Sequence, residues 1–478
     1  MSDLIYRTAT DLAGAIRRRE ASCVEVAEAH LQQIAAHNDT INAVVTLCAE
    51  PALDRARQAD TASHRGDLWG PLHGVPITVK DAFSTAGVRT TVGHVPFADT
   101  IPDQDGTPVA RLLGAGAVLL GKTNMPPFGR NFQTDNELFG RTNNPWDITR
   151  TPGGSSGGGT AAVASGMVPL ELGADFAGSI RVPAHFCGVF GLKPTEFLVP
   201  DEALPQPRTI RHMAQPGPIA HSAEDLALVL RILAGPDPHI REVPPVPLSE
   251  AANRPLASYK IAWMSGLPGA EPSSTIRASM THLADGLAEI GCPIQEALPE
   301  GWTFDPLMET WATIGNAEIG SAMDDEAREE TCQMRGTTAD AADPLLRGLH
   351  RGLYADNRTF AQALHKRDAF AAALDQLFEG VDILLMPVSM TTAFPHWPTG
   401  EPISVDGRDQ HYWTVGLGHT VPCNLTGHPA LSCPLGLADD GLPVGVQVVG
   451  RRWGDMELLG FAERLSAFVG PIGRSAIS

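Results

Sequence analysis

The first part of the chain alternates apolar and polar positions with the period of helices. Two helices are predicted over 8–37 and a third over 51–65. In the second helix apolar residues recur every three or four positions, which places them on one face that packs against a larger body. Ser22 and Glu25 have the spacing of a capping box, so this helix is expected to begin at Ser22.

A short strand pattern follows, in which Val75, Ile77 and Val79 alternate with other residues and Lys80 comes next. Functional side chains of α/β proteins gather at the carboxyl ends of strands. Lys80 is therefore a candidate for a functional site, and the ordinary alternative is a lysine exposed to water at the surface.

Farther along, strand-like and helix-like segments alternate, which predicts an α/β protein whose sheet extends through the C-terminal half. The region 303–378 has a helical pattern throughout. The other predicted segments are strands over 117–120, 259–264, 293–297, 382–387, 430–435 and 443–450, and helices over 108–113, 158–165, 222–234, 274–289, 411–426 and 455–468.

Glycine-rich turns dominate the stretch 153–195, and two of them carry serines, Ser155–Ser156 and Ser179. Glycine tolerates positive φ, so such turns can direct several N–H groups at one point. These turns and Lys80 are the main candidates for chemistry.

The loop 125–150 is rich in Asn, Gly, Pro and aromatic residues, a composition typical of ordered loops that line sites. Phe128 and Phe132 are candidates for a wall of the substrate pocket, and Met386 and Trp413 are tentative additions. Ordinary packing of these side chains is the alternative.

Two short motifs match known patterns without the structural context that the patterns need. Residues 116–123 fit the G-x-x-x-x-G-K-[ST] loop that binds phosphate, but the predicted strand falls inside the match and prolines follow it. Residues 153–157 fit the G-x-S-x-G elbow of α/β hydrolases, but the segment before them has a loop pattern. Both interpretations are disfavoured.

Composition narrows the class of protein. The 478 residues are 43% hydrophobic and 19% charged, which suits a globular chain with a sizeable core. No apolar run approaches the ~18 residues of a membrane span, and no secretory signal is recognised. Seven scattered cysteines without a CxxC favour reduced thiols in a cytoplasmic protein, and the net charge of −20 opposes binding to a nucleic-acid backbone.

The motifs together closely resemble the amidase signature family. The glycine-rich stretch reads GGSSGG and then GADFAGSIRVPAHFCGVFGLKPT, and the lysine lies in GVPITVKD. The segments TNMPPFG, FGRTNNPWD, TGHPALSCPLG and GLPVGVQVVG extend the resemblance from about residue 70 to 450.

The resemblance implies a single-domain α/β/α fold over 1–478, with a large mixed, twisted sheet covered by helices. Within this domain we expect N-terminal helices over 1–66 and the signature core over 70–200. A helical insertion over 300–380 and a C-terminal return to the sheet over 381–478 complete the expected domain.

The family's catalytic triad maps by motif onto Ser179 as nucleophile, Ser155 as bridging serine and Lys80 as base. The resemblance also implies a cis peptide bond between Gly154 and Ser155. Lysine acts as a base only when neutral, and lowering its pKa from ~10.4 to near 7 requires about 4–5 kcal/mol of desolvation or charge repulsion.

The backbone N–H groups of Phe176, Ala177, Gly178 and Ser179 are the expected donors to the oxyanion. Ala177 stands where the family usually has glycine, so its φ is expected to be one that alanine tolerates. Phe176 is larger than the usual small residue there, and it could intrude on the acyl pocket.

Four residues are expected to support the turns and not to react. Asp175 and Arg181 are predicted to form a structural ion pair beside the nucleophile. Neither is needed in the proton relay, because its roles are already assigned to the triad. Gly154 and Ser156 flank the bridging serine and are assigned the same kind of role.

The leading prediction is hydrolysis of a small-molecule amide through an acyl-enzyme, giving an acid and an amine or ammonia. Anilides, esters and carbamates are related substrates, because they form the same kind of tetrahedral intermediate. No cofactor, metal, nucleic acid or membrane partner is expected, and a homodimer stays open.

Three alternatives remain: the glutamine-hydrolysing subunit of a tRNA-dependent amidotransferase, a nucleotide-binding module using 116–123, and a catalytically inactive binding protein. The acidic charge and the unusual Phe176–Ala177 pair argue against the first.

Overall fold

The large mixed sheet predicted from the sequence is present in the structure, a computed structural model that describes residues 4–202, 209–250, 253–475 and 477. Residues 1–3 of the expected N-terminal segment lie outside this range. The strands are β1 (Val44–Leu47), β2 (Pro76–Lys80), β3 (Val118–Thr123), β4 (Leu170–Asp175), β5 (Phe190–Lys193), β6 (Gln215–Ala220), β7 (Ile261–Trp263), β8 (Ile294–Glu296), β9 (Ile383–Pro387), β10 (Ile403–Val405), β11 (Arg408–Gln410), β12 (Ala430–Leu437) and β13 (Pro443–Val449).

Within the described residues, eleven of these strands form one sheet in the order β1-β3-β2-β4-β6-β5-β12-β13-β9-β7-β8. Strand β2 is parallel to both of its neighbours, β3 and β4. Strands β10 and β11 form a separate hairpin. The parallel centre matters for the site, because β2 and β4 end at the same edge of the sheet and deliver the residues that follow them to one place.

Helices cover both faces of the sheet. They are α1 (Ala9–Arg17), α2 (Cys23–Ile41), α3 (Ala49–Arg65), α4 (Thr107–Gly114), α5 (Gly157–Ala164), α6 (Arg181–Cys187), α7 (Ala223–Leu233), α8 (Ser274–Glu289), α9 (Phe304–Gly320), α10 (Asp325–Arg335), α11 (Pro344–Leu353), α12 (Asn357–Gly380), α13 (Tyr412–Leu417), α14 (Val421–Thr426) and α15 (Asp455–Val469). Short 3₁₀ turns occur at Val95–Phe97, Pro127–Gly129 and Leu256–Ser258.

Strand alternation divides the core between the two faces. Ile77 and Val79 of β2 pack with α1, α4, α7, α8 and α15 on one face. Residues of α2, α5, α6, α9, α12, α13 and α14 form the apolar clusters of the other face. Thr78 and Lys80 point to this second face, because successive side chains of a strand alternate. The lysine therefore enters the layer that contains α5 and α6.

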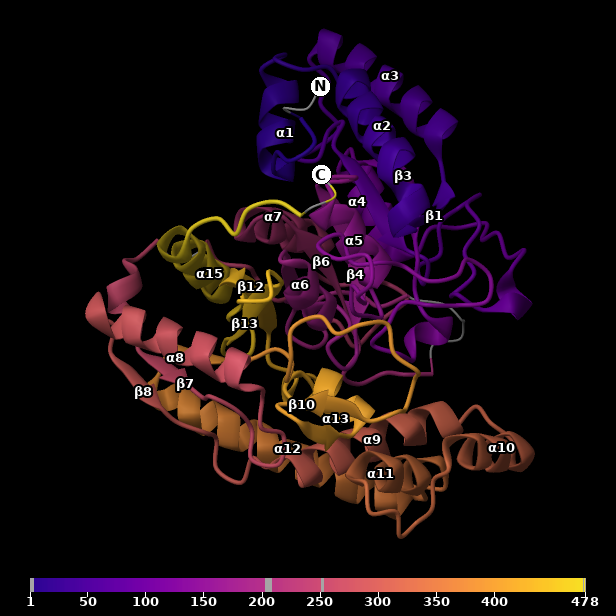
Figure 1. Cartoon of the computed structure of the whole chain (residues 1–478). Coiled ribbons are helices and arrows are strands. Elements are labelled where there is room, and N and C mark those ends of the chain that lie inside the picture. The colour runs from indigo at the N-terminus through magenta and orange to yellow at the C-terminus, as the bar shows by residue number, and fades with distance from the viewer. Residues whose placement is uncertain (1–3, 203–208, 251–252, 476, 478) are drawn as a thin grey trace.

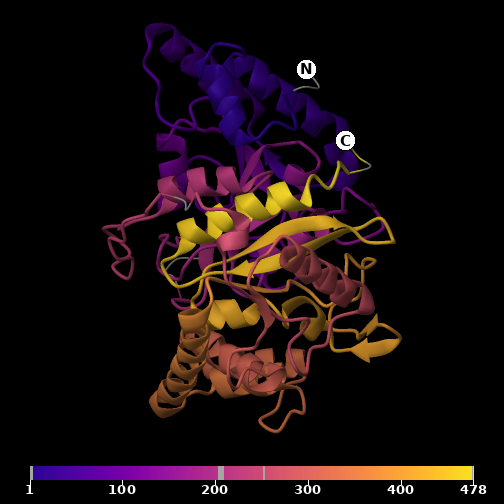
Figure 2. The same ribbon diagram turned by 90° about the vertical axis from the view of Figure 1, so that its left-hand side faces the viewer.

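The chain is long in one direction, with α1, α2 and α3 at one end and α9, α10 and α11 at the other (Figures 1 and 2). The sheet lies between these ends, and α7 and α15 run side by side across one of its faces (Figure 2). No helix of the described residues combines the length and apolar character needed to cross a bilayer.

Most predicted segments are confirmed, including the capping box of Ser22 and Glu25 at the start of α2. The helix expected over 411–426 is instead two short helices, α13 and α14, with residues 418–420 between them. Strands β1, β4, β5, β6, β10 and β11 were not predicted.

Candidate active site

Lys80 lies at the end of β2 with its side chain almost fully buried, at 2% exposure. Its Nζ donates a hydrogen bond to Ser155 Oγ at 2.7 Å and a long one to Ala174 O at 3.5 Å. Burial lowers the pKa of Lys80 to about 7, and the carboxylates of Asp175 and Glu171 oppose this shift. The surface alternative for this lysine is therefore wrong, and its neutral form is accessible near neutral pH.

Ser155 lies in the turn before α5, and its peptide bond with Gly154 is cis, as the resemblance implied. Its side chain is buried at 2% exposure. A Cβ on Gly129 would stand 3.1 Å from Ser155 Oγ, so that glycine covers the hydroxyl closely. A Cβ on Gly154 would stand 2.9 Å from the carbonyl carbon of Phe132. The turn therefore has space for a serine at 155 and none for a side chain at 154.

Ser156 points differently from Ser155, although the two are adjacent. Its hydroxyl donates to Ala174 O in β4 at 3.3 Å, and its N–H donates to Ser179 O at 3.0 Å. Ser156 thus joins the first serine turn to the second, and Ser155 is the serine of the pair that accepts a hydrogen bond from Lys80. This arrangement supports the division of roles expected from the motif.

The second turn connects β4 with α6 and surrounds the Asp175 carboxylate. Asp175 accepts hydrogen bonds from the N–H of Gly178 at 2.8 Å and of Ile180 at 3.1 Å. It also forms an ion pair with Arg181 at 2.8 Å, in which neither side chain is exposed. Burial alone would raise the pKa of Asp175, but Arg181 and the side-chain amide of Asn424 hold it well below its usual range. The predicted ion pair is present, and it shapes the turn.

Ser179 is partly exposed, in contrast to the buried Lys80 and Ser155. A nucleophilic hydroxyl must be reachable by its substrate, and the partial exposure of Ser179 is compatible with that role. The structure thus brings the three residues of the expected triad to one edge of the sheet, on β2 and on the turns before α5 and α6.

The set of expected oxyanion donors needs a correction. The N–H of Gly178 already donates to Asp175, so it is not available to a substrate. No acceptor is found among the described residues for the N–H groups of Phe176, Ala177 and Ser179. Ala177 has no positive φ, in agreement with the expectation for an alanine in this turn.

The predicted pocket also changes. Phe132 is 1% exposed and Met386 is 0% exposed, and both lie in the apolar core of the second face. Such side chains offer no surface to a ligand, so the prediction that Phe132 and Met386 line the pocket is wrong. Phe128 and Trp413 are partly exposed, and the Phe128 ring lies 4.7 Å from the imidazole of His94.

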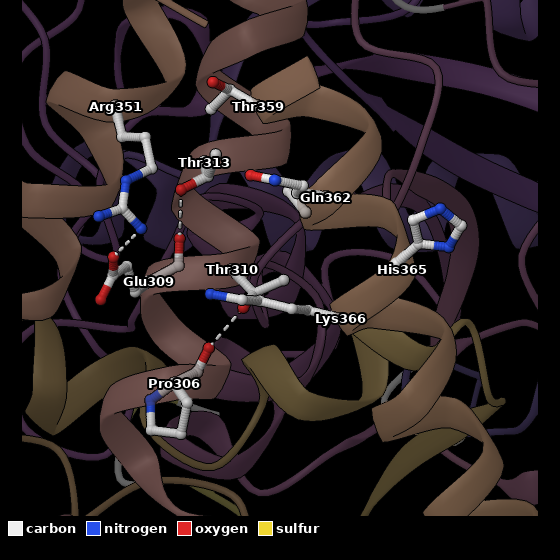
Figure 3. Close-up of a pocket in the computed structure, with 10 residues that line it drawn as sticks. Pro306, Glu309, Thr310, Thr313, Arg351, Thr359, Gln362, His365 and Lys366 are labelled. Atoms are coloured by element: carbon white, nitrogen blue, oxygen red, sulfur yellow. Dashed lines mark hydrogen bonds and ion pairs between the residues drawn. The ribbon is translucent and has the colours of Figure 1, made fainter. Parts of the chain in front are cut away.

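A cavity of about 610 Å³ lies elsewhere, between α9, α11 and α12 (Figure 3). Glu309 of α9 pairs with Arg351 of α11 on one side of this cavity, and Gln362, His365 and Lys366 of α12 line the other (Figure 3). None of the triad residues lines it. We therefore place the candidate active site at the serine turns, because a cavity without a suitably placed nucleophile does not account for the catalytic motifs.

The phosphate-loop match is excluded by its geometry. Lys122 and Thr123 belong to β3 and are fully buried. Lys122 donates to Phe83 O and to the Thr85 hydroxyl at 2.9 Å, and burial lowers its pKa to about 8. In a phosphate-binding loop the lysine lies between a strand and a helix, and its amino group is free to reach the phosphate. Lys122 lies inside a strand, and its amino group is buried and bonded to the protein.

Several supporting residues were missed in the sequence. Asn424 donates to Asp175 at 3.0 Å, Thr420 donates to Ala177 O at 2.6 Å, and Gln447 accepts a hydrogen bond from Arg181. They come from α14, the segment before it and β13, more than 200 residues after the turn that they hold. No local periodicity marks such contacts.

Comparisons with known proteins identify the family of the chain. The family Amidase matches residues 25–459 of the chain. The chain is 35% identical to a glutamyl-tRNA(Gln) amidotransferase subunit from Salinispora tropica, with 100% of both proteins covered. It is 33% identical to an acylamidase of Rhodococcus erythropolis, with 97% of this chain and 96% of that protein covered.

Comparison with solved structures also indicates the amidase signature fold. A bacterial aryl acylamidase of the amidase signature family superposes with a TM-score of 0.84 at 26% identity, over 98% of this chain and 97% of that one. The 6-aminohexanoate cyclic dimer hydrolase superposes with a TM-score of 0.80 at 28% identity, over 98% of both chains. The chain has the amidase signature fold, belongs to the amidase family and is an amide-hydrolysing enzyme.

Proposed function

We propose that the enzyme cleaves a small-molecule carboxylic amide through an acyl-enzyme on Ser179. The observation that carries this proposal is the 2.7 Å hydrogen bond between buried Lys80 and Ser155, beside the turn that presents Ser179. Serine is a weak nucleophile unless a base removes its proton during attack. A neutral lysine reached through a second hydroxyl can supply that base.

Each step of the proposed cycle conserves atoms and charge. Ser179 Oγ attacks the carbonyl carbon while its proton passes to Ser155 Oγ, and the Ser155 proton passes to Lys80 Nζ. The C–N bond then breaks, and the proton returns from Lys80 through Ser155 to the departing amine. Water enters by the same relay and releases the acid from Ser179.

In this proposal the N–H groups of Phe176, Ala177 and Ser179 donate hydrogen bonds to the negative oxygen of the tetrahedral intermediate. These donors belong to a turn fixed by Asp175 and Arg181, so they need little reorganisation when charge develops. One such donor typically contributes about 3–4 kcal/mol to the transition state.

A hydrolysis panel tests the proposal. Purified enzyme is incubated with an aliphatic amide, an aryl anilide, an ester, a carbamate and glutamine, and the products are read by mass spectrometry. We expect acid and amine from at least one amide, and no turnover by Ser179→Ala of unchanged fold. Turnover by Ser179→Ala near the wild-type rate would overturn the assignment of the nucleophile.

A second candidate is the glutaminase subunit of a tRNA-dependent amidotransferase, favoured by the 35% identity to one amidotransferase subunit over the whole chain. The unusual Phe176–Ala177 pair argues against this second candidate, and the Phe176 ring packs on Trp311 beside the oxyanion turn, with the ring centroids 5.0 Å apart. Glutamine hydrolysis that appears only with partner subunits would favour the second candidate. Hydrolysis of an acyl anilide by the isolated chain would favour the first.

The proposal includes a small-molecule substrate, a cytoplasmic location and no nucleic-acid partner. The net charge of −20 supports the last point. A homodimer remains compatible with the proposed chemistry, which uses residues of one chain only.

A further inference from the structure

The peptide group between Ala177 and Gly178 is anchored at both ends. Its carbonyl accepts a hydrogen bond from Thr420 Oγ1 at 2.6 Å, and its N–H donates to Asp175 at 2.8 Å. The C=O and N–H of a trans peptide point in opposite directions. Fixing the direction of the C=O therefore also fixes the direction of the N–H, and in this peptide both groups have a hydrogen-bond partner.

The preceding peptide group, between Phe176 and Ala177, is anchored at one end only. The Phe176 carbonyl accepts a hydrogen bond from the indole Nε1 of Trp311 at 3.2 Å. The Ala177 N–H at the other end has no acceptor among the described residues. Because this peptide is trans, the indole directs the free N–H away from α9.

Trp311 also holds the Phe176 side chain. The two rings lie 5.0 Å apart, and a Cβ on Gly315, one turn farther along α9, would stand 2.7 Å from the Phe176 ring. Trp311 itself is 8% exposed, so its position is fixed by packing. The residues of α9 that line the cavity in Figure 3, Pro306, Glu309, Thr310 and Thr313, do not take part in these contacts.

We propose that Trp311 is a positioning residue for the hydrolysis proposed above: its indole N–H orients the Phe176–Ala177 peptide so that the Ala177 N–H faces the reacting carbonyl oxygen. The inference rests on the proposed function. It assigns to α9, an element of the helical insertion, a direct role in building the oxyanion site.

Trp311→Phe tests the inference, because it keeps an aromatic ring beside Phe176 and removes the donor. Loss of a complete oxyanion donor lowers kcat about 10²–10³-fold, so a misdirected donor is expected to lower kcat about 10–100-fold. KM should stay within about twofold, because the bond acts on the transition state and not on the bound substrate.

Trp302→Phe is the matched control. Trp302 is also buried, at 1% exposure, and its Nε1 donates to Phe370 O at 3.3 Å, away from the oxyanion turn. This control loses the same kind of hydrogen bond, so a comparable loss of thermal stability with kcat near wild type is expected. A structural role of Trp311 would instead give the two variants equal kcat.

A second readout uses a trifluoromethyl ketone analogue of an accepted amide, which forms a tetrahedral oxyanion with a catalytic serine. In Trp311→Phe its inhibition constant should rise in parallel with the fall in kcat/KM, while inhibition by the carboxylate product stays unchanged. Equal weakening of both inhibitors would overturn the inference.

If Trp311→Phe does not fold, Gly315→Ala is the variant that tests the inference. It retains the indole, displaces the Phe176 ring and should also lower kcat with little change in KM. Wild-type kcat in whichever variant folds would overturn the inference. A wild-type enzyme that hydrolyses no amide would instead count against the proposed function, so the two failures are distinguishable.

Discussion

The rate of hydrolysis is predicted to fall steeply as the pH is lowered through 7, because Lys80 must be neutral to accept the relayed proton. Burial lowers the pKa of Lys80 from 10.5 to about 7, against the opposing carboxylates. At pH 7 roughly half of the molecules then hold neutral lysine, compared with roughly 0.03% for an unperturbed lysine. Burial thus increases the fraction of active base about 1,500-fold.

The assay is kcat/KM measured from pH 5 to pH 9 on one amide. With a pKa near 7, kcat/KM should fall about 90-fold between pH 8 and pH 5, with a slope of one on the acidic side. A sample held at pH 5 and returned to pH 8 must recover its activity, which excludes acid unfolding as the cause.

Glu171 is the group that could be mistaken for Lys80, because burial raises its pKa to about 7. Glu171→Gln separates them. Removing a carboxylate that favours protonated Lys80 should move the acidic limb to lower pH without abolishing it. A profile that is flat from pH 5 to pH 9, or a limb that disappears in Glu171→Gln, would refute the neutral-lysine mechanism.

Five further substitutions, grouped into three tests, examine neighbouring parts of the site. Ser155→Ala should lower kcat by several orders of magnitude, whereas Ser156→Ala should act mainly on thermal stability; a greater kinetic loss in Ser156→Ala would contradict the assigned relay. Gly129→Ala places a Cβ 3.1 Å from Ser155 Oγ and should lower kcat, whereas Gly87→Ala, with a similar positive φ and no atom within 4 Å, should reduce only stability. Asp175→Asn leaves a buried guanidinium without its counter-charge and should lower the free energy of unfolding by about 3–5 kcal/mol in denaturant titration, an expectation that an unchanged titration would overturn.

The sequence was sufficient to predict which segments of the chain form the candidate site. Alternation of Ile77 and Val79 predicted that Lys80 ends a strand, and the structure places it there with its Nζ on Ser155. The glycine-rich motifs identified both serine turns. These features are local, so a pattern of a few residues determines them.

Strand β6 illustrates what could not be predicted. Its sequence, Gln215–Ala220, contains Pro216 and Pro218, and proline normally argues against a strand inside a sheet. The strand pairs along its length with β4 but with β5 only at Ile219 and Ala220. The prolines therefore lie where one side of the strand has no ladder to interrupt.

Side-chain positions that depend on residues distant in the sequence could not be predicted either. Phe132 was predicted to line the pocket, but Gly416 leaves space for its ring, and a Cβ there would stand 2.6 Å from it. The anchors Trp311 and Thr420 contact the oxyanion turn from elements more than 100 residues away. Only the assembled fold shows which peptide groups of that turn remain free.

The most direct test of the account is to trap the acyl-enzyme. A slowly hydrolysed carbamate is mixed with the enzyme, the reaction is quenched in acid, and intact-mass and peptide-mapping spectra are recorded. The account predicts one added carbamoyl group, located on Ser179 and absent in Ser179→Ala. An adduct on Ser155 or Ser156, or full turnover by Ser179→Ala, would contradict it.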